Sequence, residues 1–186
     1  MSKIAIFMAN GCEEIEGLTV VDILRRANQE ITMVSITEDR MVTSSHGVTF
    51  QTDACIDEVD FSSYDGVVLP GGLPGTNHLG DCPKVVETIK AFHQQGKLVG
   101  AICAAPSVLG KNGLLEGKNG TSYPGYEDEM PGCTYLHQSV VRDGNIITSR
   151  GMGTSIDFAL EIVSYFSDKE TAAALADKII YNNYLK

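Results

Sequence analysis

The sequence predicts an α/β protein: a three-layer sandwich with a doubly wound, mostly parallel sheet of the flavodoxin-like kind. Segments with strand patterns alternate with segments of helical periodicity along almost all of its 186 residues. Two strand segments, GVVL at 66–69 and KLVGAI at 97–102, are almost entirely apolar, which is typical of parallel strands covered on both faces. No internal repeat or low-complexity linker interrupts the chain, so residues 1–186 are expected to form one domain.

The first elements are a strand, a helix and a second strand. Lys3–Met8 is an apolar strand that ends at the Asn10-Gly11 turn. Glutamates follow at positions 13, 14 and 16, and they suit the first turn of a helix because acidic side chains face the positive end of its dipole. Apolar residues at helical spacing extend this helix to Arg26, and the β-branched run Ile31–Ile36 predicts the next strand.

The middle of the chain predicts a hairpin, a strand and a helix. Residues 41–51 form the hairpin, with Ser45-His46-Gly47 at its turn, and Asp53–Ser63 is a polar connection. The strand at 66–69 ends sharply at the Pro70-Gly71-Gly72 break. Pro83–Gln95 is an amphipathic helix with Pro83 in its first turn and Gly96 as its C-terminal cap.

The last part of the chain predicts three helices and a second hairpin. The strand at 97–102 leads into a helix over Ala104–Lys111. Val140–Ser149 is a hairpin around Asp143-Gly144. Helices follow over Gly153–Phe166 and Asp168–Leu185, and the opening SDKE of the last one resembles a capping box.

Composition excludes several classes of function. A net charge of −10 repels phosphate backbones, so specific nucleic-acid binding is not expected. No apolar run reaches the roughly 18 residues that span a bilayer, and the short apolar stretch near the N-terminus is not a secretory signal, so we expect a cytoplasmic protein without a membrane partner. The five cysteines form no CxxC pair and the four histidines no HExxH spacing, so neither a disulfide framework, a metal site nor a cofactor is predicted.

Three loops should meet at the carboxyl edge of the sheet, where open α/β proteins bind their ligands: Asn10–Gly17, Pro70–Thr76 and Cys103–Pro106. Cys103 stands at a strand-to-helix junction among small residues, which is the pattern of a nucleophile elbow. The N-terminus of the following helix would lower the pKa of its thiol. A cysteine at the end of a buried strand is equally consistent with a plain core residue, and the local sequence does not separate the two readings.

The two other loops offer partners for this thiol. The backbone N–H groups of Gly71, Gly72 and Ala104 are candidates for an oxyanion hole, although a PGG stretch is also an ordinary turn. Of the three glutamates, two are expected to be solvated and one to face the sheet edge. A carboxyl beside a thiolate must be protonated, and burial together with the neighbouring negative charge would raise its pKa in that direction.

At these residues the sequence resembles the ThiJ/PfpI superfamily, in particular the branch of the parkinsonism-associated protein deglycase and the bacterial ThiJ/YajL-like proteins. The matching stretches run in collinear order over nearly the whole chain: GCEEIEGLTVVDILRRA, YDGVVLPGG, AICAAPSVL, ITSRGMGTSIDFALEIV and IIYNNY. The resemblance implies Cys103 as the reactive thiol and Glu16 as its partner carboxyl, with the amides of Gly72 and Ala104 as the oxyanion site. It also places Arg26 and Arg150 near the pocket or a dimer interface, and it implies a homodimer formed through the first-helix region.

Two departures from the family pattern bear on mechanism. Protease-like members carry a histidine directly after the cysteine, where this chain has Ala104. The eukaryotic branch has a pocket histidine where this chain has Tyr123. Glu16 is therefore expected to be the main proton carrier, with Tyr123 lining the pocket.

The resemblance implies a cofactor-independent glyoxalase or protein deglycase that acts on methylglyoxal-type α-oxoaldehydes and on early glycated protein. An oxidative-stress sensor or redox chaperone that works through oxidation of Cys103 is the alternative, because an accessible low-pKa thiol oxidises readily. A cysteine peptidase or amidotransferase is disfavoured by the missing histidine. Flavin or nucleotide binding is disfavoured because the first loop carries glutamates where a phosphate cradle needs glycines and a cation.

Overall fold

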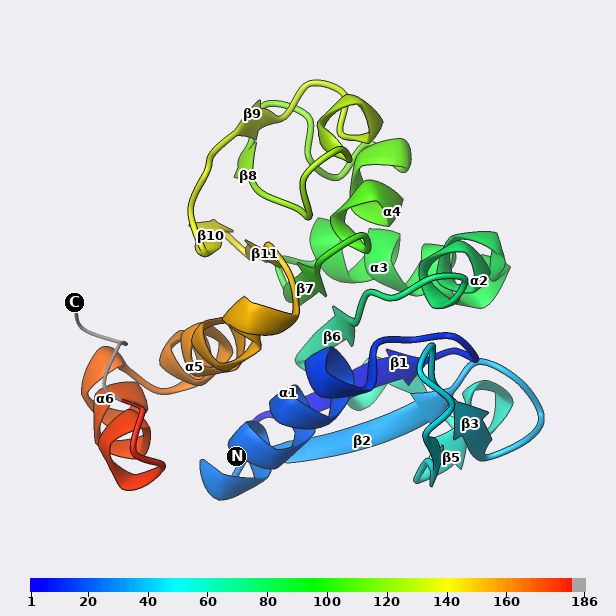
Figure 1. Cartoon of the computed structure of the whole chain (residues 1–186), viewed down its shortest axis with the longest axis horizontal. Helices are drawn as coiled ribbons and strands as arrows, with labels where there is room; N and C mark the ends of the chain where they lie inside the picture. The colour runs from blue at the N-terminus through cyan, green and yellow to red at the C-terminus, as the bar shows by residue number, and fades with distance from the viewer. Residues whose placement is uncertain (182–186) are drawn as a thin grey trace.

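The structure, a computed structural model, describes residues 1–181 and confirms the predicted three-layer fold (Figure 1). A seven-stranded sheet has the order β10-β11-β7-β6-β1-β2-β5, and all its pairs are parallel except β10 with β11. Its strands are β1 (Lys3–Met8), β2 (Glu30–Ser35), β5 (Ala54–Cys55), β6 (Gly66–Leu69), β7 (Leu98–Ile102), β10 (Val140–Asp143) and β11 (Ile146–Ser149).

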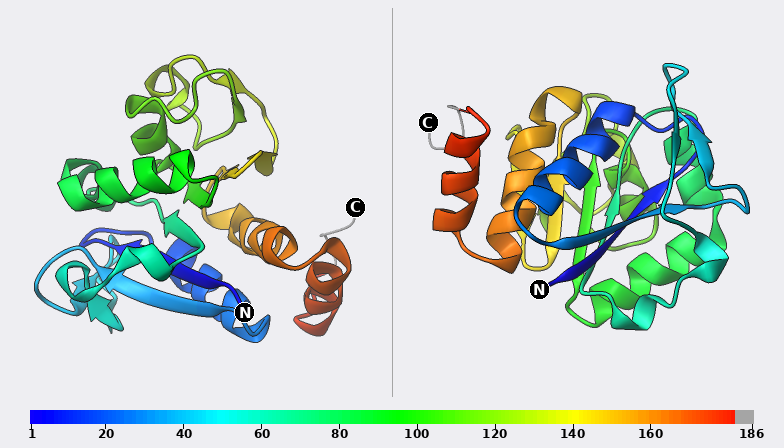
Figure 2. Two further views of the ribbon diagram at one scale, coloured as in Figure 1. Left: turned by 180° about the vertical axis from the view of Figure 1, so that it is seen from behind. Right: turned by 90° about the horizontal axis from the view of Figure 1, so that it is seen from below.

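Helices cover both faces of the sheet (Figures 1 and 2). They are α1 (Glu14–Arg26), α2 (Gly75–Asp81), α3 (Pro83–Gln94), α4 (Pro106–Lys111), α5 (Ser155–Phe166) and α6 (Lys169–Lys178). One apolar cluster joins the sheet to α1, α5 and α6, with Ile6 and Phe158 fully buried in it. A second cluster on the opposite face joins it to α2, α3 and α4 around Phe7 and Leu109. Each large apolar side chain so buried contributes about 1.5–3 kcal/mol, and the two clusters hold the strand ends in fixed positions.

Two small sheets lie outside the central one. The predicted hairpin is β3 (Met41–Thr43) with β4 (Thr49–Gln51), paired antiparallel. The other sheet pairs β8 (Asn119–Gly120) with β9 (Thr134–Tyr135), which the sequence did not indicate because each strand has only two residues.

Several sequence expectations are corrected in detail. The polar connection at 53–63 holds β5, which pairs with β2 at the sheet edge, and two single helical turns. The helix expected from Ala104 begins at Pro106, because Cys103 has a left-handed backbone that no helix contains. The glycine-containing segment of α2 was not predicted as a helix, since it lacks an apolar period.

The C-terminal helix also differs from its expected bounds. It starts after Asp168, whose side chain accepts a hydrogen bond from the Thr171 N–H at 2.7 Å. It ends at Lys178 instead of Leu185, and residues 182–185 lie outside the described part of the chain. Among the helices of residues 1–181, none combines the length and the apolar character that crossing a membrane requires.

Candidate active site

Three loops meet at the carboxyl edge of the sheet, as the sequence predicts. The loop after β1 donates a hydrogen bond from the Glu13 N–H to the Gly71 carbonyl oxygen at 2.9 Å, and the loop after β6 returns one from the Gly75 N–H to the Gly11 carbonyl oxygen at 3.1 Å. β1 and β6 are neighbours from which the chain crosses to opposite sides of the sheet order. Their loops therefore flank the topological switch point, the usual ligand site of such sheets.

Cys103 occupies the elbow between β7 and α4. Its φ is +64°, a left-handed value that a side chain with a Cβ rarely adopts. Hydrogen bonds fix this conformation from both sides: the Cys103 N–H donates to the Ser149 carbonyl oxygen at 3.0 Å, and the Tyr123 N–H donates to the Cys103 carbonyl oxygen at 2.8 Å. The neighbouring structure therefore holds a strained residue whose thiol is only partly buried, which is typical of a functional position.

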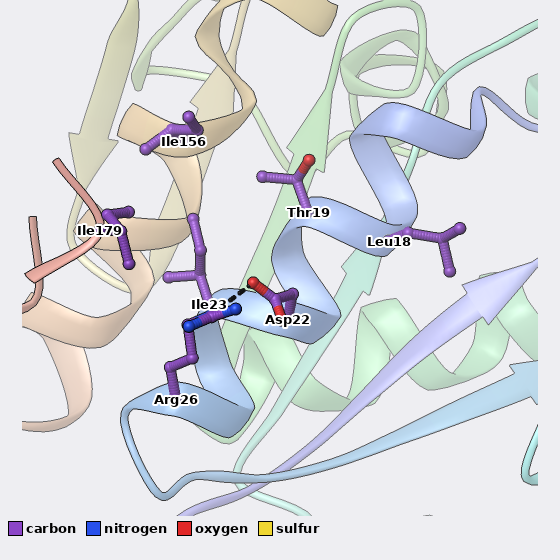
Figure 3. A pocket seen from close by; sticks show the side chains of 7 residues that line it. All are labelled: Leu18, Thr19, Asp22, Ile23, Arg26, Ile156 and Ile179. Atoms are coloured by element: carbon purple, nitrogen blue, oxygen red, sulfur yellow. Dashed lines mark hydrogen bonds and ion pairs between the residues drawn. The ribbon is translucent and has the colours of Figure 1, made fainter. Parts of the chain in front are cut away.

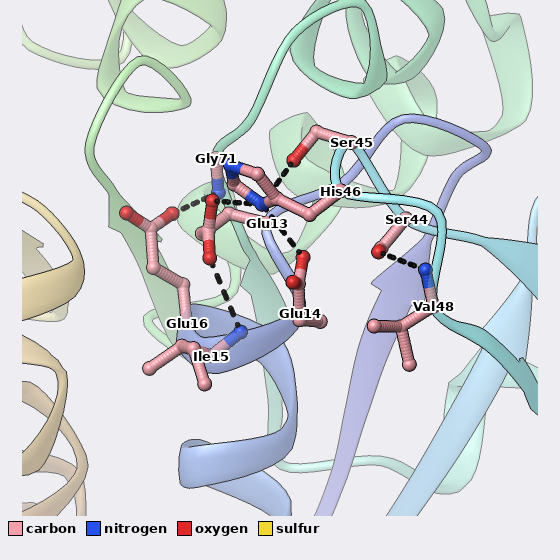
Figure 4. Close-up of polar contacts among 9 residues, drawn as sticks. All are labelled: Glu13, Glu14, Ile15, Glu16, Ser44, Ser45, His46, Val48 and Gly71. Carbon is pink, nitrogen blue, oxygen red and sulfur yellow. Dashed lines mark hydrogen bonds and ion pairs between the residues drawn. The ribbon is translucent and has the colours of Figure 1, made fainter.

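Glu16 is the glutamate that faces the thiol. It lies in the first turn of α1 and is only 1% exposed, whereas Glu13 and Glu14 are less buried. Its carboxyl accepts a hydrogen bond from the Gly71 N–H at 2.8 Å, drawn in Figure 4, and forms another with the Cys103 thiol. The predicted pair of Cys103 and Glu16 is thus in contact.

Burial dominates the electrostatics of this pair. It raises the pKa of Glu16 to about 7, against the lowering effect of the Cys103 and Gly71 hydrogen bonds. It also raises the pKa of Cys103 to about 12, with the negative charge of Glu16 as the second cause. The lowered pKa of Cys103 that the sequence predicted is wrong, because burial and the charge of Glu16 outweigh the lowering effect of the neighbouring Ala104 and Gly72 N–H groups.

The two groups titrate as a unit, because each sets the charge that the other meets. From about pH 7 upward one proton remains on the pair. When Glu16 holds it, the carboxyl carries no charge and its O–H donates to sulfur, and both changes favour the thiolate. The N–H groups of Ala104 and Gly72 also face the sulfur and lower the pKa of its thiol.

The glycines of the β6 loop make this contact possible. A Cβ on Gly71 would lie 2.5 Å from the Cys103 Cβ and 2.6 Å from the Glu16 Oε2, closer than side chains approach. Gly72 has a φ of +89°, and a Cβ there would strike the backbone of residues 12 and 13. Of the predicted oxyanion donors, Gly72 and Ala104 point at the reacting sulfur, whereas the Gly71 N–H is already used by Glu16.

A cavity of about 300 Å³ opens in front of the thiol. Its walls are Glu13, Ser45, His46, Gly72, Leu73, Cys103, Ala104, Tyr123 and Tyr126. Tyr123 therefore lines the pocket as predicted. The sequence did not identify His46, Leu73 or Tyr126, which reach the cavity from separate loops. For His46 a signal was available: β2 runs parallel to β1 and ends at the same edge of the sheet, so the hairpin that follows β2 begins near the cavity.

The two predicted arginines do not line this cavity. Arg26 borders a larger hollow of about 540 Å³ on the flank of α1, where its Nε bonds the Asp22 carboxylate at 2.6 Å (Figure 3). Aliphatic side chains make up most of the other walls of that hollow: Leu18, Thr19, Ile23, Ile156 and Ile179. Arg150 contacts the His137 ring nitrogen at 3.2 Å.

Two carboxylates and an imidazole lie together at the rim of the cavity. Side-chain oxygens of Glu13 and Glu14 and a ring nitrogen of His46 all lie within 4.8 Å of one another (Figure 4). The hydrogen bond to Glu14 and the ion pair with Glu13 account for this cluster without a metal ion.

Comparison with known proteins finds relatives that match nearly the whole chain. The sequence profile of the DJ-1/PfpI family matches residues 2–165. Protein dj-1beta of Drosophila melanogaster is 38% identical over 183 residues, which cover 97% of this chain and 98% of that protein. Glutathione-independent glyoxalase DJR-1.2 of Caenorhabditis elegans is 31% identical over 94% of this chain and 93% of its own length. The solved structure titled Toxoplasma gondii DJ-1, oxidized, superimposes with a TM-score of 0.94 at 34% identity, covering 98% of this chain and all of that one.

Proposed function

This chain belongs to the DJ-1/PfpI family, and on that premise we propose that it is a glutathione-independent glyoxalase that uses Cys103 as its nucleophile. The observation that supports this best is the buried contact between the Cys103 thiol and the Glu16 carboxyl. The thiol lines a cavity large enough for a three-carbon dicarbonyl, and the buried carboxyl interacts with that thiol, which is the arrangement a nucleophile and its proton carrier need. The Caenorhabditis elegans relative bears the name of this activity.

The first step is addition of sulfur to the aldehyde carbon of methylglyoxal. The C–S bond forms, the electrons of the carbonyl π bond move to oxygen, and the N–H groups of Gly72 and Ala104 stabilise the developing charge. The proton shared by Cys103 and Glu16 neutralises that oxygen. A hemithioacetal results, and Glu16 is left as a carboxylate.

The second step is isomerisation. The Glu16 carboxylate removes the hydrogen of the carbon bound to sulfur and returns it to the neighbouring carbon, which converts the hemithioacetal into a lactoyl thioester. Its raised pKa of about 7 suits both directions of this transfer, since a base near the working pH is neither too weak to accept the proton nor too strong to release it. Water then cleaves the thioester, and lactate leaves as the thiol recovers its proton.

The test is conversion of purified methylglyoxal without glutathione, followed as lactate formed. We expect turnover by the wild type and a loss of at least ~10³-fold in Cys103→Ala. Cys82→Ala is the matched control, because Cys82 is a free thiol that does not line the cavity. Equal rates for Cys103→Ala and the wild type would remove the proposal.

The same chemistry extends to early adducts of methylglyoxal on protein, which would make the chain a deglycase. In such an adduct the C–S bond forms at the aldehyde-derived carbon as its C–N bond breaks, and the protein amine leaves with the proton of the pair. The hemithioacetal that results then follows the same isomerisation. A homodimer formed through the first-helix region and a cytoplasmic location complete the proposal.

A role as an oxidative-stress sensor or redox chaperone, through oxidation of Cys103, is the second candidate function. The Glu16 carboxyl and two backbone N–H groups surround the sulfur, so they can hold the oxygens of a sulfinate formed by peroxide. We expect mild peroxide to add two oxygens per chain, and none at that dose to Cys103→Ala. Intact-mass spectra measure this, and oxidation spread over all five cysteines would speak against it.

A further inference from the structure

His46 stands at the mouth of the Cys103 cavity, at the tip of the β3–β4 hairpin. Its side chain is 65% exposed and forms part of the wall of the cavity that Cys103 also lines. Position 123, where the resemblance to the eukaryotic branch implies a pocket histidine, carries tyrosine in this chain. The structure thus brings an imidazole to the same cavity from a different element.

The hairpin tip is anchored. The Ser45 N–H donates to the Cys12 carbonyl oxygen at 2.8 Å, and the Gly11 N–H donates to the Thr43 carbonyl oxygen at 2.8 Å. The Thr43 N–H in turn donates to the Asn10 Oδ1 at 2.9 Å. These bonds join the hairpin to the loop that leads into α1, where Glu16 lies. The imidazole therefore has a defined position relative to Cys103 and Glu16.

The imidazole is held through one nitrogen only. Its Nδ1 lies 3.2 Å from the Glu14 Oε2, 3.4 Å from the Glu13 Oε2 and 3.3 Å from the Ser45 Oγ (Figure 4). Within residues 1–181, Nε2 makes no hydrogen bond. A carboxylate on Nδ1 with a free Nε2 is the arrangement that orients a histidine for proton transfer.

The charged neighbours favour the protonated ring. Glu14 and Glu13 raise the pKa of His46 above its ordinary value. The other titratable groups of the cavity are the Cys103 thiol and the phenols of Tyr123 and Tyr126. The ring of His46 therefore keeps its proton to a higher pH than an isolated imidazole would, and it lines the same cavity as the Cys103 thiol.

We propose that His46 is the second proton carrier of the glyoxalase reaction: it exchanges protons with the two substrate oxygens while Glu16 exchanges them with the two carbons. This rests on the proposed function. It assigns a catalytic role to a residue of the hairpin turn, oriented by Glu14 as a positioning residue.

During the isomerisation His46 and Glu16 each release one proton and take one up. As Glu16 removes the hydrogen of the carbon bound to sulfur, the freed electron pair forms the carbon–carbon double bond. The ketone π electrons move to its oxygen, which takes a proton from His46 Nε2. In the enediol the two oxygens are adjacent, so neutral His46 then accepts the proton of the first hydroxyl while Glu16 protonates the second carbon. Both residues return to their starting states, and the product is the thioester.

The test compares pH profiles of turnover on methylglyoxal for the wild type, His46→Gln and Glu14→Gln. We expect His46→Gln to lower kcat by ~10²-fold and to abolish the alkaline limb of the profile, because that limb reports loss of the donor proton. Glu14→Gln should move the limb to lower pH, since it removes the main cause of the raised pKa. Added imidazole should restore part of the activity of His46→Ala, because the site is open to solvent.

His78→Gln is the matched control. His78 is an exposed histidine of α2 that is not part of the cavity wall, so its loss should leave kcat within about twofold of the wild-type value and the pH profile unchanged. Unchanged turnover and an unchanged alkaline limb in His46→Gln, alongside an inactive Cys103→Ala, would overturn this inference and leave the proposed function standing. A wild type that forms no lactate would remove both.

Discussion

Two hollows border α1, and they differ in chemistry more than in size. The hollow on its flank is the larger, about 540 Å³ against about 300 Å³, and its walls are mostly aliphatic with one exposed ion pair. The cavity at its N-terminal end is lined by a left-handed cysteine that a buried carboxyl faces. Both of these features destabilise the fold, by about 1–3 kcal/mol for the backbone alone. The comparison indicates that stored strain and buried charge, and not volume, distinguish the candidate active site from the other hollow.

The largest expected effect follows removal of the buried charge. Glu16→Gln should lower kcat by ~10³-fold, because the amide cannot accept the substrate proton. It should also stabilise the protein at pH 8. The pKa of Glu16 is raised to about 7 in the fold from an ordinary 4.5, so the folded state binds the extra proton between these values and stability falls as pH rises through this window. The total is about 3 kcal/mol.

Urea unfolding of the wild type and Glu16→Gln at pH 5 and pH 8 measures this change in stability. The stability gain of Glu16→Gln over the wild type should be small at pH 5 and reach its full value at pH 8. A variant that is less stable than the wild type at both values would show that the hydrogen bonds of Glu16 outweigh the burial of its charge.

The next effect tests the geometry of the pair without changing its chemistry. Gly71→Ala keeps Cys103 and Glu16 but inserts a methyl group 2.5 Å from one and 2.6 Å from the other. We expect turnover to fall by ~10²-fold and stability by about 1–3 kcal/mol, as is usual for overpacking. Gly153→Ala is the control, because no atom lies within 4 Å of its Cβ position. Retained activity in Gly71→Ala would mean that the contact between thiol and carboxyl is not required.

A substitution on the flank of α1 should lower stability without lowering turnover. Ile23 is 3% exposed and contributes to both the apolar cluster and the larger hollow. Ile23→Ala should reduce the free energy of unfolding by about 2–4 kcal/mol, since it removes buried methyl groups and leaves a void. Its kcat on methylglyoxal should stay within about twofold of the wild-type value. A fall in kcat as large as that of Gly71→Ala would contradict the separation of the two regions.

Much of the site could be predicted because its signals are local. The apolar strand, the small residues and the proline around Cys103 describe the elbow, and acidic residues in a first helical turn describe Glu16. The choice among three glutamates and the raised pKa of the thiol could not be read, since both depend on burial by distant segments. His46 was placed correctly in a hairpin turn, but only the path of the chain after β2 brings that turn over the cavity.

The fold was predictable for a similar reason. Long apolar strands and amphipathic helices have periods that a sequence reveals, and the strands and helices with such patterns were placed to within about two residues at most of their ends. Two-residue strands such as β5 and β8 have no period, so their pairing is set by tertiary contacts alone. The start of α4 shifted because residues 103–105, which begin with the left-handed Cys103, form a turn between β7 and the helix.

The smallest effect concerns Arg26, which the family resemblance placed near the pocket or the dimer interface. Its guanidinium forms an exposed i,i+4 pair with Asp22, and such pairs contribute little to stability because water and salt screen them. We expect Arg26→Gln to leave the thermal midpoint and the turnover of methylglyoxal unchanged within error. The decisive measurement is kcat/KM beside the molecular mass in solution. A fall in kcat/KM at constant mass would connect the flank of α1 to the Cys103 cavity and end the division drawn between the two hollows, whereas a fall in mass alone would assign Arg26 to contact with a second copy of the chain.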